Sequence, residues 1–353
     1  MRILALNFER GWRGGERQTL YNTQGLIAAG ITTHLLCRKG QPLEAAAKKA
    51  GITVHAFASK MAVLGFLIKH GAQYNILHAQ TSQILTYCVV TKWFHGAAVV
   101  FTRRINKPQS GLLTQLKYKY TNKLVAISSA IKQTLASFTK RCDIEVISDV
   151  VVPKPADKER ISTLRNQQYL TGKTIIGTTA AFTAEKDPFT MLNAVEILRS
   201  LEPNFVFLHF GSGPMLAKVE TAAKAKGLEQ HYRFMGFEND VEAIIPLFDL
   251  FVISSKQEGL GSSVLDAFAH KVPVVATNAG GLAALVNKER GISCAVGDAA
   301  ALAAAMQHML HHPEQAKLLA NNAYEYVHEE HSLQSITQKY LTLFNSTVAT
   351  ATV

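Results

Sequence analysis

Short apolar runs alternate with longer, helix-patterned segments along the whole chain, and this alternation constrains the fold more than any other feature of the sequence. The runs are rich in Val, Ile, Leu and Phe, as buried strands are. Seven lie in the first half and six in the second: RILALN, THLLC, ITVHAF, NILHA, AAVVFT, KLVAI and IEVI, then KTIIGT, NFVFLHF, YRFMGF, LFVIS, VPVVAT and GISCAV. Such strands, alternating with helices, predict an α/β fold with parallel sheets covered on both faces.

The alternation runs through the chain twice. A chain of 353 residues is too long for one ordinary core and has room for two domains. Two prolines and mixed charges interrupt the rhythm at 150–162. We therefore expect two Rossmann-like, doubly wound domains at 1–155 and 170–330, and a last helix within 331–353 that packs back toward the first domain. Tandem domains of this type usually bind a ligand in a cleft between them, at the carboxyl ends of the strands.

The excess of positive charge lies in the first half of the chain. Residues 1–150 contain 20 Lys and Arg against 6 Asp and Glu, whereas residues 151–353 contain 17 against 20. The split predicts that the first half faces anions, such as membrane headgroups, acidic glycans or nucleic acid. Because no nucleic-acid-binding motif is present and the second half is acidic, we expect no nucleic-acid partner.

One segment of the first half combines cations with apolar side chains. RRINKPQSGLLTQLKYKYTNK (103–123) mixes three leucines and two tyrosines with six cations: Arg103, Arg104, Lys107, Lys117, Lys119 and Lys123. This pattern suits contact with an anionic bilayer or a phosphorylated glycolipid, and it equally suits a solvated face above a core helix.

No segment predicts a membrane span or a secreted protein. The apolar run Ile3 to Leu6 is shorter than a signal-peptide core, and the stretch Met61 to Ile68 is far shorter than a spanning helix. The four cysteines lack metal-ligand spacing and there is no D-x-D motif. We expect a cytoplasmic protein, peripheral on the inner face of the membrane, that uses no metal and no cofactor.

Glycine turns follow several of the predicted strands. Glycine lets the backbone approach a ligand, and the first N–H groups of a helix bind phosphate. Each turn alone equally suits an ordinary strand-to-helix connection. Lys186, at the start of a predicted helix, is either a contact for a diphosphate or a solvated surface lysine. The glycines of these turns are Gly14 and Gly15, Gly211 and Gly213, Gly236, and Gly259 and Gly261.

The segment QEGLGSSVLDAFA (257–269) adds two carboxylates to such a turn. A helix that starts after the glycines would aim the N–H groups of Ser262 and Ser263 at an anion. Glu258 would stand just before the turn and Asp266 one helical turn after it. A carboxylate accepts two hydroxyl hydrogen bonds, as a ribose or sugar diol requires. The alternative is an ordinary acidic residue beside a helix N-cap.

The order of these features resembles the retaining nucleotide-sugar glycosyltransferases of glycosyltransferase family four. Their GT-B architecture is two Rossmann-like domains facing across a cleft. The resemblance covers nearly the whole chain and is strongest over 175–310, in AEKDPFTMLNAVEIL, FLHFGSGPML, YRFMGF and LFVISSKQEGLGSSVLDAFAHKVPVVATNAGGLAALV. The family hallmark of two glutamates separated by seven residues reads here Glu258 to Asp266.

The resemblance implies a role for each matching residue. Asp266 would bind the donor ribose, Glu258 the transferred sugar or its phosphate, and Lys186 the leaving phosphate. Where many members have a histidine after AAVVFT, this chain has Arg103 and Arg104, which complete the expected catalytic set with Glu258 and Lys186. Further nucleotide-sugar contacts would come from Gly14, Gly15, Gly211, Gly213, Met235, Gly236, Phe237, Gly259, Leu260, Gly261, Ser262 and Ser263.

Two departures from the family pattern concern the donor site. Asp266 is one methylene shorter than the usual glutamate, and Ala181 stands where the family often has an arginine. The resemblance implies sugar transfer, with retention, from a nucleotide-diphosphate sugar to a glycan or glycolipid in cell-envelope polysaccharide or lipopolysaccharide synthesis. Two alternatives stay open: a nucleotide-sugar epimerase or other non-transferase enzyme of this fold, and an inactive partner subunit that only binds a nucleotide sugar.

Overall fold

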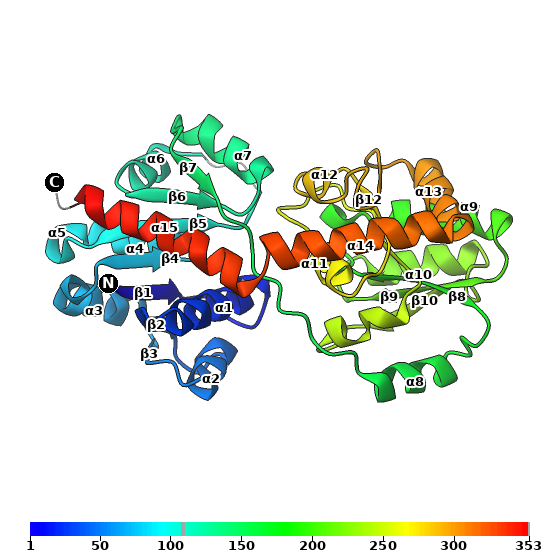
Figure 1. The fold of residues 1–353 in the computed structure, drawn as a ribbon, viewed down its shortest axis with the longest axis horizontal. Coiled ribbons are helices and arrows are strands. Elements are labelled where there is room, and N and C mark those ends of the chain that lie inside the picture. The colour runs from blue at the N-terminus through cyan, green and yellow to red at the C-terminus, as the bar shows by residue number, and fades with distance from the viewer. Residues whose placement is uncertain (107–109, 352–353) are drawn as a thin grey trace. The chain divides into compact units, whose positions relative to one another are not determined.

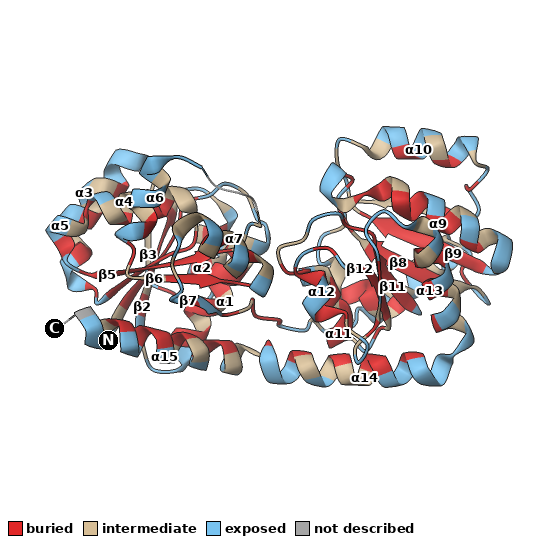
Figure 2. Cartoon of the chain, turned by 90° about the horizontal axis from the view of Figure 1, so that it is seen from above, coloured by how far each residue is buried: buried red, intermediate tan, exposed pale blue. Residues whose placement is uncertain are grey.

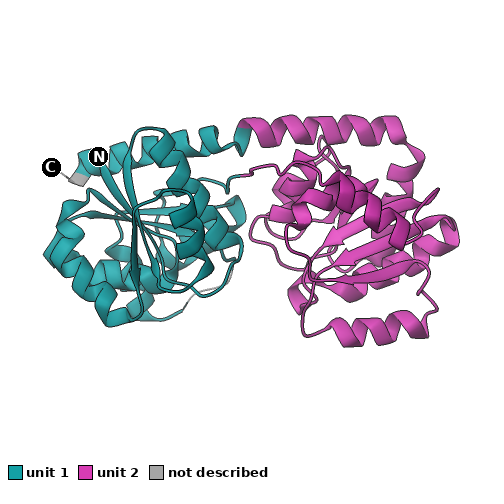
Figure 3. Ribbon diagram, turned by 90° about the horizontal axis from the view of Figure 1, so that it is seen from below, with its two compact units in different colours: residues 1–150, 330–353 teal, residues 151–329 magenta. Residues whose placement is uncertain are grey.

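The computed structural model describes residues 1–106 and 110–351. The chain divides into two compact units (Figure 3). Unit 1 contains residues 1–150 and 330–353, and unit 2 contains residues 151–329. The chain therefore passes from unit 1 to unit 2 and back again.

Unit 1 is built on a seven-stranded parallel sheet with the order β3-β2-β1-β4-β5-β6-β7 (Figure 1). Each of the seven runs predicted in the first half forms one of these strands. The central strands are almost wholly buried, as at Ile3, Leu77 and Val100, because helices cover both faces, whereas the edge strands β3 and β7 are more exposed. The strands are β1 (Arg2–Asn7), β2 (Thr32–Arg38), β3 (Val54–Phe57), β4 (Ile76–Ala79), β5 (Ala98–Arg103), β6 (Lys123–Ala126) and β7 (Ile144–Val146).

The helices of unit 1 lie on the two faces of this sheet, with α1 and α15 on one and α3 to α6 on the other (Figure 2). Three helices begin where the sequence supplies a hydroxyl cap: Ser59, Thr81 and Ser128 accept a backbone N–H from the first turn of α3, α4 and α7. Such a cap is typically worth about 1 kcal/mol. The helices are α1 (Gly14–Ala28), α2 (Pro42–Lys49), α3 (Lys60–His70), η1 (Gly71–Gln73), α4 (Ser82–Val90), α5 (Lys92–His95), α6 (Leu112–Lys119), α7 (Ser129–Thr139) and α15 (Leu333–Ala351).

The helix α15 is part of the core of unit 1. Ile336, Tyr340 and Phe344 are buried in one cluster with Ile3 of β1 and Val100 of β5. Tyr340 also shares a hydrogen bond of 3.0 Å with Thr102 at the end of β5. Residues from far along the chain thus complete a core that begins at the first strand.

Unit 2 is a second parallel sheet, with the order β10-β9-β8-β11-β12-β13. It is built from the six runs predicted in the second half. The strands are β8 (Thr174–Thr179), β9 (Phe205–Phe210), β10 (Tyr232–Gly236), β11 (Leu250–Ile253), β12 (Val274–Thr277) and β13 (Ile292–Cys294). The helices are α8 (Lys158–Gln167), η2 (Ala184–Lys186), α9 (Pro188–Leu201), α10 (Leu216–Ala225), η3 (Val241–Leu247), α11 (Ser262–Ala269), α12 (Leu282–Leu285), α13 (Ala299–His311) and α14 (Pro313–Glu330).

The main core of unit 2 lies where α9 and α13 pack together against the sheet. Leu192 of α9 and Met306 of α13 are fully buried beside Phe207 and Val252. Helix α14 adds Leu319 to the same core. This packing fixes the strands whose carboxyl ends carry the candidate site.

Candidate active site

Each sheet has one point where the strand order reverses direction. It lies between β1 and β4 in unit 1 and between β8 and β11 in unit 2. At such a point the connections that follow the two strands leave toward opposite faces of the sheet, and open α/β sheets bind their ligands there, outside the carboxyl ends of the strands. The residues after β1, β4, β8 and β11 are therefore the first to consider.

In unit 2 the segments after β8 and β11 bring Lys186 and Glu258 together. Lys186 is the last residue of η2, and its ammonium forms an ion pair with the Glu258 carboxylate. The Ser255 hydroxyl donates a second hydrogen bond to the same carboxylate oxygen, at 2.9 Å. The side chains are 25% and 10% exposed, so the pair is largely shielded from water while the ammonium keeps some access to solvent. Two of the four expected catalytic side chains thus meet at the reversal point.

Backbone and hydroxyl hydrogen bonds hold these two segments against each other. The Lys256 N–H donates to the Glu185 carbonyl at 2.8 Å, and the Ser254 hydroxyl donates to the Lys186 carbonyl at 3.1 Å. On the other side, the Gly281 N–H donates to the Glu258 carbonyl at 3.1 Å. The Lys186–Glu258 pair is consequently positioned by its main chain and does not depend on side-chain contact alone.

The backbone conformation of the turn before α11 requires a glycine at position 261. Gly261 has φ +100°, and a Cβ there would lie 2.5 Å from Cδ2 of Leu282. The bonds of α11 begin when Val264 N–H donates to the Gly261 carbonyl at 3.0 Å. The N–H groups of Ser262 and Ser263 come before that bond, in the position that binds anions at helix starts.

Asp266 lies on the outer side of α11. It is half-buried, whereas Val264, Leu265 and Phe268 face the core and are fully buried. It follows Ser262 by four residues, and residues at that spacing lie on one face of a helix. Leu260 was expected to contact the nucleotide sugar, but it is buried, at 6% exposure.

Gly211 and Gly213 have a packing reason that the sequence did not reveal. A Cβ on Gly211 would come within 2.0 Å of the Ala180 carbonyl oxygen, and one on Gly213 within 2.5 Å of the Phe182 carbonyl oxygen. The turn after β9 is bonded to this segment, since Phe182 N–H donates to the Ser212 carbonyl at 3.1 Å. These glycines therefore let two backbone segments touch, whether or not a ligand also uses them.

Met235 and Gly236 end the edge strand β10, and Phe237 follows it. Gly236 has φ +74° beside an irregularity in the pairing with β9, and its carbonyl accepts the Gly211 N–H at 2.7 Å. Phe237 is 72% exposed and Met235 is half-buried. The three residues stand at the carboxyl edge of the same sheet as Lys186 and Glu258.

In unit 1, Gly14 and Gly15 are the first residues of α1, after β1. A Cβ on either would have no described atom within 4 Å. The turn is held by the buried Glu16, whose carboxylate accepts the Arg13 N–H at 2.9 Å and the Asn7 side-chain amide at 3.3 Å. The two glycines therefore leave open space at the start of the helix, which neither packing nor a positive φ demands.

Arg104 follows β5 and is fixed by two partners at the strand ends. Its Nε donates to the Asp149 carboxylate at 3.0 Å, and its Nη1 donates to Gln80 Oε1 at 2.5 Å. Gln80 in turn contacts His78, whose Nε2 lies 2.8 Å from the Thr102 hydroxyl. Burial, assisted by the charge of Arg104, lowers the pKa of His78 to about 3, so this histidine is neutral.

Arg103 faces a different environment from Arg104. It is buried, and its Nη1 donates to the hydroxyl of Tyr118 in α6 at 3.2 Å. The two expected catalytic arginines thus belong to unit 1, one under α6 and one at the strand ends. Lys107, which shares their basic segment, lies outside the described residues.

Sequence reasoning missed the partners that position these groups. Ser255 precedes Glu258 by three residues in the loop between β11 and α11, and nothing in that spacing alone predicts that their side chains meet. Gln80 and Asp149 follow predicted strands closely, so their place at the sheet edge was available. What the sequence lacked was the strand order that brings them beside Arg104.

The arrangement suits the binding of a phosphorylated, hydroxyl-rich ligand. An ammonium and the N–H groups of a helix start favour negative charge, and nearby carboxylates favour hydroxyl groups. Among the residues described, no group of three or more His, Cys, Asp or Glu side chains is placed to hold a metal ion. None of the described helices combines the length and apolar character that a membrane crossing requires.

The two Rossmann-like units define the GT-B glycosyltransferase fold. The crystal structure of Anabaena Alr3699/HepE in complex with UDP matches with a TM-score of 0.87, at 17% identity over 98% of this chain and 100% of that chain. The family model described as glycosyl transferases group 1 matches residues 161–326. The matched residues lie within unit 2 and include Lys186, Glu258 and Asp266.

The curated relatives that the chain matches include proteins named as glycosyltransferases. The lipopolysaccharide core biosynthesis glycosyltransferase LpsD of Rhizobium meliloti (strain 1021) is 24% identical over 99% of each chain. The 2-deoxystreptamine glucosyltransferase of Streptomyces kanamyceticus is 31% identical over 48% of this chain and 46% of that protein. The chain matches several other relatives over less than half of their length. The named relatives are glycosyltransferases, which does not favour the epimerase alternative.

Proposed function

We propose that the protein transfers a sugar from a nucleotide-diphosphate sugar to a glycan or glycolipid acceptor of the cell envelope, with retention at the anomeric carbon, as family-four enzymes do. The observation that carries the proposal is the Lys186–Glu258 pair at the reversal point of the unit 2 sheet, close along the chain to the start of α11. The structural neighbour named for its complex with UDP supports a nucleotide donor, and LpsD supports a lipopolysaccharide-type acceptor.

The residues of unit 2 match the charges of the reaction. Breaking a sugar–diphosphate bond builds negative charge on the leaving oxygen and positive charge on the ring. Lys186 and the N–H groups of Ser262 and Ser263 stabilise the first, and one such donor is typically worth about 2.7 to 4 kcal/mol. Glu258 faces the sugar and Asp266 the ribose. The reaction needs no divalent metal, because these donors carry the leaving charge and the phosphate accepts the proton of the acceptor.

The residues of unit 1 serve the acceptor in this proposal. Arg104 presents a guanidinium held by Asp149 and Gln80, whereas Gly14 and Gly15 leave space for their main chain to contact the phosphate of the nucleotide-sugar donor. Arg104 suits an anionic acceptor such as a phosphorylated glycolipid, while the buried Arg103 holds α6 through Tyr118. The enzyme would then work on the cytoplasmic side, at the inner face of the membrane.

A donor screen tests the reaction directly. The protein is incubated with UDP-, GDP- or ADP-sugars and a lipopolysaccharide-core or lipid-linked acceptor, and nucleotide release and product are followed with and without EDTA. We expect transfer with one nucleotide class, unchanged by EDTA, and NMR of the product showing the anomeric configuration of the donor. Free epimerised sugar without transfer, or an inverted product, would contradict the proposal.

A matched pair of lysine variants tests the site. Lys186→Met should reduce turnover by about a hundredfold or more, the loss expected for one stabilising donor. Lys226 is the control, because it lies in the same unit and its ammonium contacts Glu196 at 2.5 Å with comparable exposure. Lys226→Met should leave turnover close to wild type. Equal activity of the two variants would remove Lys186 from the mechanism.

A further inference from the structure

The middle of unit 1 contains no acidic residue over a long stretch. Residues 45–142 have 14 Lys and Arg and not one Asp or Glu among 98 positions. This stretch supplies β3 to β6 and α3 to α7, so a whole helical face of the sheet is built from it (Figure 2). That face has only positive formal charges of its own, and its complementary partner is an anionic surface.

Large apolar side chains are exposed on the same face. Trp93 is 93% exposed and Phe94 63%, both on α5, while Leu112 is 78% and Leu113 83% exposed at the start of α6. Helices α5 and α6 both pack against α4. We call this surface the α5–α6 face and define it by Val90, Trp93, Phe94, Leu112, Leu113, Leu116 and Tyr120, all exposed.

The leucines of α6 form an outward stripe. Leu112, Leu116 and Tyr120 are spaced by four residues and therefore lie on one side of the helix. The buried residue of α6 is Tyr118, which turns to the opposite side. Exposed apolar residues on a solvated surface are normally scattered singly, whereas here at least four large ones lie together on two neighbouring helices.

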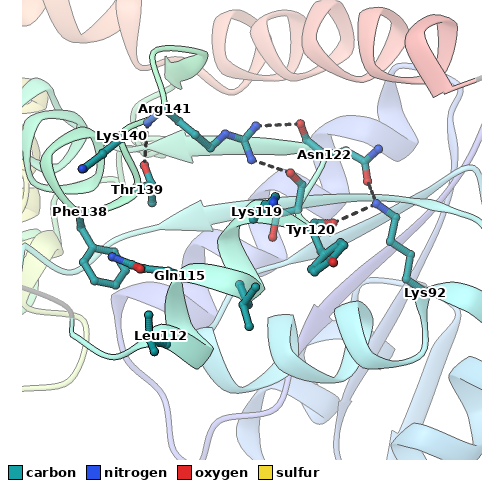
Figure 4. Close-up of a pocket in the computed structure, with 12 residues that line it drawn as sticks. Lys92, Leu112, Gln115, Lys119, Tyr120, Asn122, Phe138, Thr139, Lys140 and Arg141 are labelled. Atoms are coloured by element: carbon teal, nitrogen blue, oxygen red, sulfur yellow. Dashed lines mark hydrogen bonds between the residues drawn. The ribbon is translucent and has the colours of Figure 1, made fainter.

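Between α6 and α7 the face is hollowed by a groove of about 900 Å³ (Figure 4). Two of its cations are structural. Lys92 donates to the Tyr120 carbonyl at 3.0 Å, and Arg141 donates to the Thr121 carbonyl at 2.7 Å and to the Asp143 carboxylate at 2.8 Å. These bonds tie down the end of α6, so its leucines are presented from a fixed helix.

Two other lysines of the groove are available to a partner. Lys119 and Lys140 are exposed, and within the residues that the structure describes neither ammonium pairs with a carboxylate. The groove is therefore lined both by Leu112 and Leu116 and by two ammonium groups that have no carboxylate partner among the described residues. Apolar side chains next to unpaired lysines match the boundary between acyl chains and lipid phosphates.

We propose that the α5–α6 face docks on an anionic phospholipid bilayer. Trp93, Phe94, Leu112 and Leu113 enter the interface, and Lys119 and Lys140 attract the phosphate groups. A bilayer fits better than a nucleic acid, because exposed aliphatic leucines gain from acyl chains and contribute nothing to base stacking. The inference deepens the proposed function, since a glycolipid acceptor would be reached from this surface, but it is tested without donor or acceptor.

The first test is vesicle co-sedimentation of the full chain. Vesicles of phosphatidylcholine are compared with vesicles containing roughly one-third phosphatidylglycerol, at low and high salt. We expect binding to the anionic vesicles at least about tenfold tighter at low salt, and a loss of this preference as salt rises. Equal binding to both vesicle types, or binding to RNA or heparin but not to vesicles, would overturn the proposal.

Matched variants assign the binding to the face. Leu112→Ser with Leu113→Ser should weaken binding to anionic vesicles by about tenfold, and Lys119→Glu with Lys140→Glu should weaken it at least as much. The controls lie in unit 2: Leu318→Ser, also an exposed leucine, and Lys218→Glu with Lys224→Glu on α10. Controls that lose binding as much as the face variants would refute the assignment. Thermal unfolding verifies that all variants are folded.

A spectroscopic test follows the insertion itself. The chain has two tryptophans, Trp12 and Trp93, so Trp12→Phe leaves Trp93 as the single emitter. Its emission should shift to shorter wavelength when anionic vesicles are added and stay unchanged with phosphatidylcholine alone. Emission that does not respond to the anionic vesicles would mean that the face remains in water. Because no sugar donor is present, failure here leaves the transferase proposal standing, and failure of transfer leaves the docking proposal standing.

Discussion

Substitution of Gly261 by alanine tests the structural account of the turn before α11. Two costs add at this position. A non-glycine residue in the left-handed region costs roughly 1 to 2 kcal/mol. The new Cβ would also lie 2.5 Å from Cδ2 of the fully buried Leu282, and overpacking of this kind typically costs about 1 to 3 kcal/mol. We expect unit 2 to lose about 2 to 5 kcal/mol of its unfolding free energy.

The assay uses the position of the tryptophans. Trp12 and Trp93 both lie in unit 1, so their fluorescence follows the unfolding of that unit. Hydrogen exchange of the β11, β12 and α11 peptides follows unit 2. In Gly261→Ala, the unit 2 peptides should lose their protection from hydrogen exchange at a lower urea concentration than in the wild type. The urea midpoint of the tryptophan fluorescence transition should stay near its wild-type value.

A double-mutant cycle separates the two costs. Leu282→Val shortens the side chain that the new Cβ meets, so the double variant should be less destabilised than the sum of the singles, by about 1 to 2 kcal/mol. The strain of the positive φ remains in the double variant. Additive effects, or a Gly261→Ala protein as stable as the wild type, would refute the geometry described for this turn.

Three further outcomes follow from the structure. Gly15→Ala should leave unit 1 as stable as the wild type, or more stable by up to about 1 kcal/mol, because the position is helical and uncrowded. The same variant should lower turnover, because the new methyl group occupies the space proposed for the ligand. A loss of stability in fluorescence melting would contradict this. Lys186→Met should lower the unfolding free energy of unit 2 by about 1 to 3 kcal/mol, because the Glu258 carboxylate loses its partner. The double variant with Glu258→Gln should regain part of this free energy in urea unfolding, because it no longer contains an unpaired carboxylate. Lowering the pH from 7 to 5 should cost each unit at least about 2 kcal/mol, the contribution of its fully buried histidine. Burial lowers the pKa of His78 to about 3 and of His209 to about 4, whereas the unfolded histidines protonate near 6.5, so stability present above that value falls as the pH drops, as unfolding at both pH values would show.

The sequence predicted the secondary structure well because the strands are buried on both faces. A parallel sheet between helices leaves no polar face, so each strand is a continuous apolar run that needs no knowledge of its neighbours. The order of the strands in the sheet cannot be predicted in this way. It depends on the direction in which each connection crosses the sheet, and Gln80 and Asp149 became partners of Arg104 through that order alone.

Glycine shows where sequence reasoning about the site ends. Gly14, Gly211 and Gly261 all follow predicted strands and look alike in the sequence. In the structure a side chain at Gly211 would clash with a carbonyl oxygen of a neighbouring segment. Gly261 has a positive φ, and a side chain there would clash with Leu282. Gly14 has neither a positive φ nor a neighbour that excludes a side chain. Only atoms from distant parts of the chain distinguish these cases, and the same is true of the Ser255 hydroxyl that reaches Glu258.

The place of α15 in the core of unit 1 has a consequence for synthesis on the ribosome. The sheet strands of unit 1 are made first, but Ile336, Tyr340 and Phe344, which cover one face of that sheet, emerge only after the whole of unit 2. Until then Ile3 and Val100 lack part of their covering. Unit 2 can therefore complete its core before unit 1 does, and the nascent first half is the part that a ribosome-associated chaperone would need to shield.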